Sequence, residues 1–224
     1  MKDERGILEI ADGLIAELEA LPKKDAVSLR AVRRKYSRIL KQRPVKEMVK
    51  LALKLIEEPT HPRRYAAYEL LECHPGAIQQ LKLSQVRALG KGIDSWGAVD
   101  MFSGYVAGQV WRHGGIGDAE IARWARSSDR WWRRAALVAT VPLNAKAQGG
   151  EGDTKRTLAV CRMLMDDRDD MVVKAYSWAL RVLSRTDTQA VKTFIEENRD
   201  RLAARVVREV TNKLTTGLKN PKKE

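Results

Sequence analysis

Helix start signals recur along this chain at intervals of 35 and 40 residues. Asp129 and Asp169, both suited to cap a helix, lie 40 residues apart, and Asp94 lies 35 residues before Asp129. Shorter helical segments lie between them, so each interval holds a pair of helices. Repeated helix pairs of this length are typical of HEAT-type arrays, in which one helix of each pair lines a concave side. An ordinary helical bundle is the alternative fold.

Apolar residues at helical spacing fill most of the chain, and sustained strand-like alternation is absent. Leu, Ala, Lys, Arg and Glu dominate, which favours helix. Pro142 is expected to kink or end the helix that contains it. We expect one repeat domain over residues 1–218 and a flexible basic tail over 219–224. The expected helices span residues 3–21, 25–42, 44–58, 62–73, 77–82, 84–91, 96–110, 118–125, 131–147, 154–166, 187–199 and 203–217, with another around Trp178 after the acidic segment 167–170.

The formal net charge of +13 favours a polyanionic partner, most simply nucleic acid, or an acidic membrane face. A surface that is merely solvated and basic is the alternative. The expected helix 25–42 carries a concentrated basic face, with no acidic residue between Asp25 and Glu47. Such a face can follow phosphates along a nucleic-acid backbone, although a solvated face is equally consistent with the pattern. Its basic residues are Arg30, Arg33, Arg34, Arg38 and Lys41.

The cysteines and histidines indicate neither a disulfide framework nor a metal site. Cys73 and Cys161 each lie in an apolar helical pattern and are expected to be reduced core residues of a cytoplasmic protein. His61, His74 and His113 lack ligand spacing, so no metal and no cofactor is predicted. The first residues are charged, unlike a secretory signal, and no apolar run approaches the roughly 20 residues that span a bilayer. No membrane-spanning segment is therefore expected, and DNA rather than a membrane is the predicted partner.

The segment from residue 94 to residue 100 is the strongest candidate site. Ser95 is expected to cap a helix on which Trp96 and Asp100 lie four residues apart, on one face. Gly97 and Ala98 keep the neighbouring surface thin. The result is a broad aromatic face beside a carboxylate. The alternative is a Trp in the core and a solvated or capping Asp.

Equivalent helices of the repeat carry residues that could complete this site. Arg134 follows two tryptophans, and Trp178 lies in the next repeated helix. A groove formed by these helices would be basic and aromatic, with one central carboxylate, and duplex DNA fits such a wall through shape and backbone contacts. It would contain Trp96, Asp100, Arg134, Lys174, Trp178 and Arg181.

Three segments in order carry a resemblance to a known family. They are Ser95-Trp96-Gly97-Ala98-Val99-Asp100, Ser128-Asp129 with Arg134-Ala135-Ala136, and Lys174-Ala175-Tyr176-Ser177-Trp178-Ala179-Leu180-Arg181; Arg208-Glu209-Val210 matches more weakly. With them, the chain resembles the AlkD-type DNA glycosylases over most of residues 25–215. The resemblance implies an all-α fold, a right-handed superhelical array of HEAT-like antiparallel helix pairs (an α-solenoid).

The resemblance also implies a function, excision of positively charged N3- or N7-alkylated purines from duplex DNA in base excision repair. A monomer is expected, because a closed stack of repeats needs no partner chain. It implies that the damaged base is not flipped into a pocket. Trp96, Asp100 and Trp178 would form the catalytic cleft, with Asp100 stabilising the cationic sugar and positioning water. The expected DNA-binding residues are Arg134, Arg30, Arg133, Lys174, Arg181 and Arg208.

This sequence departs from the family pattern at two places. Ser95 and Gly97 stand where the family has a second acidic residue or a Trp-Trp pair, and the early aromatic residue of the family has no counterpart near Leu18 to Lys24. Two other functions therefore remain open. One is a non-catalytic protein that binds unusual DNA structures, and the other is a repeat scaffold for a protein partner, whose aromatic residues would anchor the interface.

Overall fold

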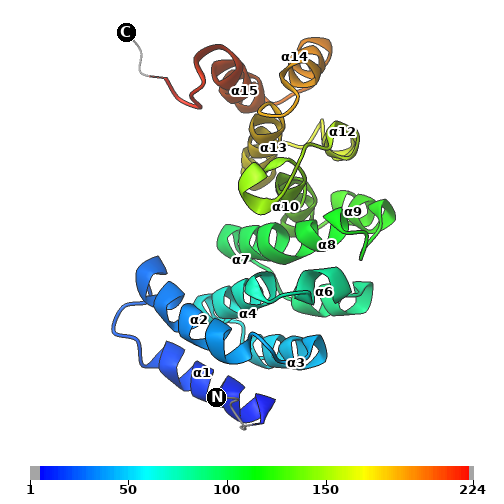
Figure 1. Ribbon diagram of the computed structural model, residues 1–224. Helices are drawn as coiled ribbons and strands as arrows, with labels where there is room; N and C mark the ends of the chain where they lie inside the picture. The colour runs from blue at the N-terminus through cyan, green and yellow to red at the C-terminus, as the bar shows by residue number, and fades with distance from the viewer. Residues whose placement is uncertain (1–5, 222–224) are drawn as a thin grey trace. The chain divides into compact units, whose positions relative to one another are not determined.

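The computed structural model describes residues 6–221, and within that range all regular structure is helical (Figure 1). The predicted all-α class is confirmed. The chain divides into two compact units, Met1–Ile116 and Gly117–Glu224. The first unit contains α1 (Ile7–Glu19), α2 (Ala26–Leu40), α3 (Val45–Leu55), α4 (His61–Cys73), α5 (Ala77–Gln80), α6 (Leu83–Leu89), α7 (Trp96–Met101), the π-helical segment η1 (Phe102–Ala107) and α8 (Gly108–Arg112).

Helix α4 is the centre of the first unit. Every residue from Pro62 to Leu71 is buried, and α4 packs against α2, α3, α7 and η1. Tyr68 of α4 meets Phe102 of η1 with the ring centroids 5.9 Å apart. On α1, Ile10 and Leu14 are fully buried, whereas Leu8 is 41% exposed. The central helix thus connects α2 to the segment that contains Trp96.

The second unit consists of helix pairs in series. Its longer helices pack in order, α10 on α13 and α13 on α15. Figure 1 shows α9, α12 and α14 on one side of this row. The bounds are α9 (Asp118–Ala125), α10 (Arg130–Val138), α11 (Val141–Asn144), the 3-10 segment η2 (Lys146–Gln148), α12 (Thr154–Met163), α13 (Asp170–Leu183), α14 (Thr188–Glu197) and α15 (Ala204–Thr216).

The predicted helix starts are confirmed by their side-chain caps. The Oδ1 atom of Asp129 accepts a hydrogen bond from the backbone N of Trp131 at 2.8 Å. Asp169 accepts one from Met171 at 2.9 Å in the same way. Ser95 Oγ caps α7 by accepting from the backbone of Ala98. These bonds satisfy amide groups that the first helical turn leaves without partners.

Two long helices differ in detail from their predictions. The predicted helix 96–110 continues to Arg112 and contains the π-helical turn of η1, whose wider i to i+5 pattern leaves no signal in apolar spacing. The predicted helix 131–147 ends at Val138, and Pro142 lies in the first turn of the short helix α11. Proline fits there because a first-turn amide needs no helical partner. The expected interruption at Pro142 is therefore confirmed.

The prediction for Cys73 was wrong. It is exposed, because it is the last residue of α4 and the chain turns away directly after it. Cys161 is fully buried as predicted, and burial raises the pKa of its thiol to about 12. Both are free cysteines.

In the described part of the chain, no helix combines the length and apolar character needed to cross a membrane.

Candidate functional site

Trp96 stands in solvent at the start of α7. Its side chain is 62% exposed, whereas Trp111 and Trp124 are 2% and 1% exposed. The alternative of a core tryptophan is thereby excluded. Asp100 follows one turn later and is partly exposed. Beside them, a Cβ atom at Gly97 would meet only His61, at 4.0 Å, so the surface is thin as predicted.

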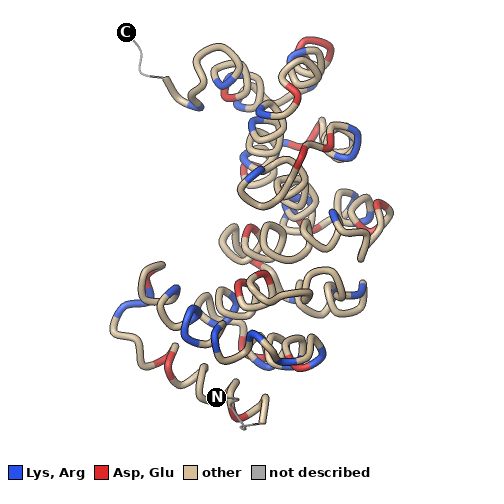
Figure 2. Tube along the Cα trace, in the orientation of Figure 1, with Lys and Arg blue, Asp and Glu red and all other residues tan. Residues whose placement is uncertain are grey.

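Helix α2 carries the predicted basic face in a narrower form. Arg33 does not belong to it, because its Nε atom lies 2.7 Å from the carboxylate of Glu69 and the pair is largely buried. Arg34, Arg38 and Lys41 are exposed, and none of them forms an ion pair with a carboxylate of residues 6–221. Together with the exposed Arg30 they follow one face of the helix, and Figure 2 shows the basic residues of α2. We call these four residues the α2 basic row.

An acidic cluster on α4 was missed by the sequence interpretation. Glu69 is 6% exposed, and Glu72 lies one turn further along the helix. Burial, followed by the nearby charge of Glu69, raises the pKa of Glu72 from its ordinary value of 4.5 to about 7. Glu72 also lines a cavity of about 330 Å³, whose polar walls include Gln109 and Arg112. The sequence pattern did not reveal this cluster, because the raised pKa of Glu72 depends on burial and not on a recognisable spacing of residues.

The variant Glu72→Gln is expected to raise the melting temperature more at pH 8 than at pH 5. The folded state binds the Glu72 proton more tightly than the unfolded chain does, so stability falls as pH rises from about 4.5 to about 7. The neutral amide avoids that loss. Thermal unfolding at both pH values measures the effect, with the exposed Glu9→Gln as control. An equal shift at both pH values would contradict this assignment.

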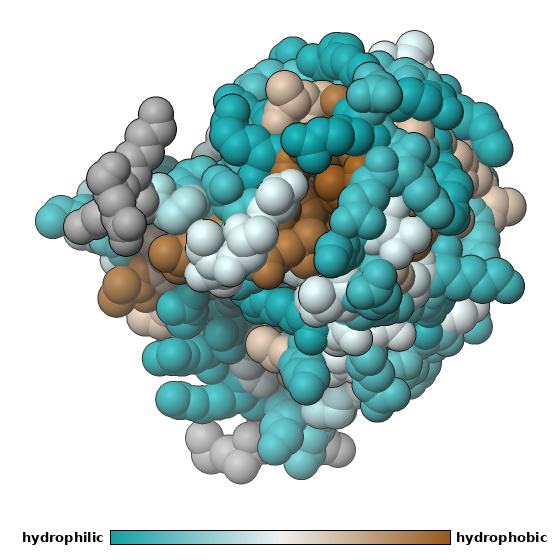
Figure 3. Space-filling model, turned by 90° about the horizontal axis from the view of Figure 1, so that it is seen from above, coloured by the Kyte–Doolittle hydropathy of each residue, from teal (hydrophilic) through white to brown (hydrophobic). Residues whose placement is uncertain are grey.

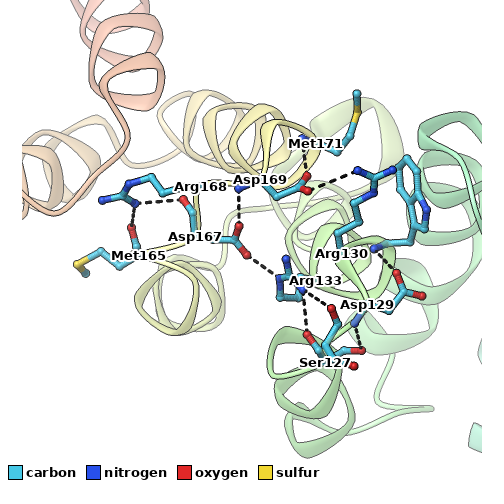
Figure 4. Close-up of polar contacts among 11 residues, drawn as sticks. Ser127, Asp129, Arg130, Arg133, Met165, Asp167, Arg168, Asp169 and Met171 are labelled. Carbon is cyan, nitrogen blue, oxygen red and sulfur yellow. Dashed lines mark hydrogen bonds and ion pairs between the residues drawn. The ribbon is translucent and has the colours of Figure 1, made fainter.

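In the second unit, Arg133 and Arg134 connect α10 to the residues at the start of α13. Arg133 donates from Nε to Asp167 at 2.6 Å and from Nη1 to the carbonyl of Ser128 at 2.8 Å (Figure 4). Arg134 is 6% exposed and donates from Nη1 to the carbonyl of Met171 at 2.5 Å, at the start of α13. Both side chains thus hold α10 against the residues at the start of α13. Their binding of DNA stays a prediction.

Helix α13 presents the other predicted residues along one face. Lys174 is exposed and pairs with Asp170 at 2.6 Å, and Trp178 is partly exposed one turn later. Arg181 follows, with its Nε atom donating to Ser177 Oγ at 3.1 Å. Burial lowers the pKa of the Arg181 guanidinium. Lys174, Trp178 and Arg181 are spaced by about one helical turn and therefore lie along one face of α13.

Helix α15 carries Arg208, a predicted DNA-binding residue, and next to it a buried carboxylate, Glu209. Arg208 is exposed and lines a hollow of about 540 Å³. On the face that carries α14 and α15, Figure 3 shows apolar residues surrounded by hydrophilic ones. Glu209 is 4% exposed, accepts a hydrogen bond from Ser177 Oγ at 2.6 Å, and lies 3.4 Å from the Lys219 ammonium. Lys219, from the predicted tail, therefore contacts α15; residues 222–224 lie outside the described residues.

The predicted site residues fall into two groups. Trp96 and Asp100 share α7, and α2 with Arg30 joins them through α4. The predicted residues of the second unit lie on α10, α13 and α15, which pack in that order. Convergence of the two groups stays a prediction. Within residues 6–221, no group of three or more His, Cys, Asp or Glu is placed to hold a metal ion.

Comparison of the amino-acid sequence with known proteins identifies a family. No curated protein and no solved structure matches the chain. The family model described as "DNA alkylation repair enzyme" matches residues 25–214, from just before α2 to near the end of α15. The match includes α7 and α13, the helices of the predicted cleft. The chain therefore belongs to the DNA alkylation repair enzyme family.

Proposed function

We propose that this protein is a DNA glycosylase that removes positively charged N3- and N7-alkylated purines from duplex DNA. The observation that carries the proposal is the exposed indole of Trp96, one helical turn from the Asp100 carboxylate, in a chain of this family. In the proposed arrangement, residues 1–218 form one right-handed HEAT-like array. Trp96, Asp100, Arg134 and Trp178 then share its concave side.

The chemistry requires few catalytic groups. An alkylated purine that carries a positive charge is already a good leaving group, so no strong general acid is needed. Positive charge develops on the sugar as the glycosidic bond breaks, and Asp100 would stabilise it and orient the attacking water. The Trp96 and Trp178 rings would contact the cationic base or sugar, at about 0.5–2 kcal/mol for each cation–π contact.

The α2 basic row would hold the DNA backbone. From Arg30 to the C-cap residue Lys41 the row covers 11 residue steps, about 16.5 Å at a rise of about 1.5 Å per residue. That length covers several nucleotides of a strand, which rises about 3.4 Å per nucleotide. Each phosphate contact releases counterions, so binding through this row depends on salt but not on sequence.

The double variant Arg34→Gln/Arg38→Gln is expected to weaken binding to duplex DNA about tenfold or more at low salt. It should also reduce the slope of log affinity against log salt by about 1.8, since two phosphate contacts are lost. Fluorescence anisotropy across a salt series measures both quantities. The matched control is Lys46→Gln/Lys50→Gln on α3, which removes two exposed positive charges at the same spacing. Equal losses in both double variants would assign the effect to net charge alone.

The direct test of the proposed function is base release. Excess protein is incubated with duplex DNA that contains 7-methylguanine, and free base is measured over time. Release at a rate above spontaneous depurination supports the proposal, and its absence rejects it. Tight, salt-sensitive binding to branched or mismatched DNA without release would instead indicate a DNA-structure binder. Indifference to all of these DNAs would indicate a protein scaffold.

A further inference from the structure

A buried polar pair fixes the connection that leads into α7. Arg64 and Tyr68 lie one turn apart on α4 and are 2% and 0% exposed. Arg64 Nη2 donates to the carbonyls of Lys91 at 3.0 Å and Gly92 at 2.7 Å, and Nη1 donates to Tyr68 Oη at 2.7 Å. Tyr68 Oη in turn donates to the carbonyl of Leu89 at 2.8 Å. The pair thus holds three carbonyls of one short connection.

Core packing alone does not account for an arginine at this position. A buried guanidinium carries a large desolvation cost, and apolar side chains of similar volume often replace buried charges without loss of stability. Within the described residues, no carboxylate forms an ion pair with Arg64. Backbone carbonyls satisfy its charge instead, and they all belong to the segment that follows α6. What Arg64 provides is therefore a defined path for that backbone.

The connection is also fixed at other points. Gly92 has a φ of +67°, and a Cβ atom there would lie 3.5 Å from Arg64 Nη2. Ile93 is 3% exposed and anchors the middle of the connection. Ser95 then caps α7, and Trp96 follows directly. Since the Trp96 side chain is largely in solvent, its position depends on this backbone more than on packing of its own.

We infer that Arg64 and Tyr68 are positioning residues, which set the start of α7 and thereby place Trp96 and Asp100 for reaction. The catalytic part of this inference rests on the proposed glycosylase function, whereas the structural part does not. Neither residue needs to touch DNA, because both act through the backbone of residues 89–92. A displacement of reacting groups by about 1 Å can cost about 10²-fold in rate.

The experiment compares Arg64→Lys and Tyr68→Phe with the wild type, using hydrogen exchange and base release. Tyr68→Phe keeps the ring and should accelerate amide exchange across residues 90–98, while α3 exchanges unchanged. Arg64→Lys should do so by tenfold or more, because lysine cannot reproduce the fork of donors. We expect the single-turnover rate of base release to fall about tenfold in Arg64→Lys, with DNA affinity within threefold of wild type. The control is Tyr65→Phe on the same helix, since the Tyr65 hydroxyl lies near Glu69 and Arg30 and makes no hydrogen bond of standard geometry within the described residues.

The outcomes separate this inference from the proposed function. Unchanged exchange across residues 90–98 in both variants would overturn it, as would faster exchange with an unchanged release rate. A purely structural role would lower the melting temperature without selective exchange in this connection. If wild type releases no base, the glycosylase proposal fails, and hydrogen exchange across residues 90–98 still decides whether the pair fixes the start of α7. If Arg64→Lys does not fold, Tyr68→Phe decides alone.

Discussion

Asp100→Asn is expected to lower the single-turnover rate of base release by about 10²- to 10³-fold. The amide keeps the size of the side chain but removes the negative charge that would stabilise the developing cation, and removal of one such electrostatic group typically costs this much. Asp100 lies one turn from the exposed Trp96, so the substitution removes a charge from the candidate cleft and from no other part of the surface. Base release from duplex DNA containing 7-methylguanine measures the rate, and anisotropy measures the affinity, which should change less than threefold.

The matched control is Asp94→Asn. Asp94 is exposed two residues before Trp96, so this variant removes the same charge from the same neighbourhood without touching the helix face. Its release rate should stay near that of wild type. Equal losses in both variants would show that general charge near the DNA, rather than a carboxylate at position 100, controls the reaction.

Gly150→Ala is expected to give the largest loss of stability, about 3 kcal/mol or more in the second unit. A Cβ atom at Gly150 would lie 2.5 Å from the Pro142 carbonyl oxygen, 2.7 Å from the Leu143 carbonyl carbon and 2.8 Å from the Ala145 nitrogen. All three are backbone atoms, so no side chain can rotate away. The melting temperature should fall by roughly 10 °C or more, as measured by circular dichroism.

Gly117→Ala provides the comparison for this prediction. Gly117 also lies in the second unit, but a Cβ atom there would meet no other atom within 4 Å. Its substitution should change the melting temperature by only a few degrees, since alanine chiefly restricts the unfolded chain. Similar losses in both variants would mean that the turn around Gly150 can move more freely than its backbone contacts indicate.

The fold was predictable where local chemistry decides it. The caps at Asp129 and Asp169 and the break at Pro142 each depend on one residue and its immediate neighbours. The π turn within 102–107 was not predictable, because its wider hydrogen-bond pattern depends on packing against α4 and not on residue spacing. The exposure of Cys73 was missed for a similar reason, since apolar periodicity does not reveal where a helix leaves the core.

The site was predictable in its faces but not in its pairings. Arg33 and Arg34 are adjacent, yet Arg33 is bound to Glu69, 36 positions away, and Arg34 remains in solvent. Periodicity places a side chain on a face, whereas a distant partner decides whether its charge is available. The same limit applies to Arg134, whose bond to Met171 spans 37 positions. The buried pair of Arg64 and Tyr68 could not be predicted for the same reason, since its partners lie 21 to 28 positions away.

The π turn of η1 has a consequence for how this surface can change. One extra residue in a helical turn rotates everything beyond it by about 100° relative to an uninterrupted α-helix. Gln109 and Arg112 therefore face a direction offset from the one that regular winding would give them after Asp100. Removing a single residue between positions 102 and 107 would restore regular winding but leave Gln109 and Arg112 facing as they do now, because the lost residue and the lost π turn cancel; the helix can therefore change its length by one residue here without altering the side chains beyond Asp100.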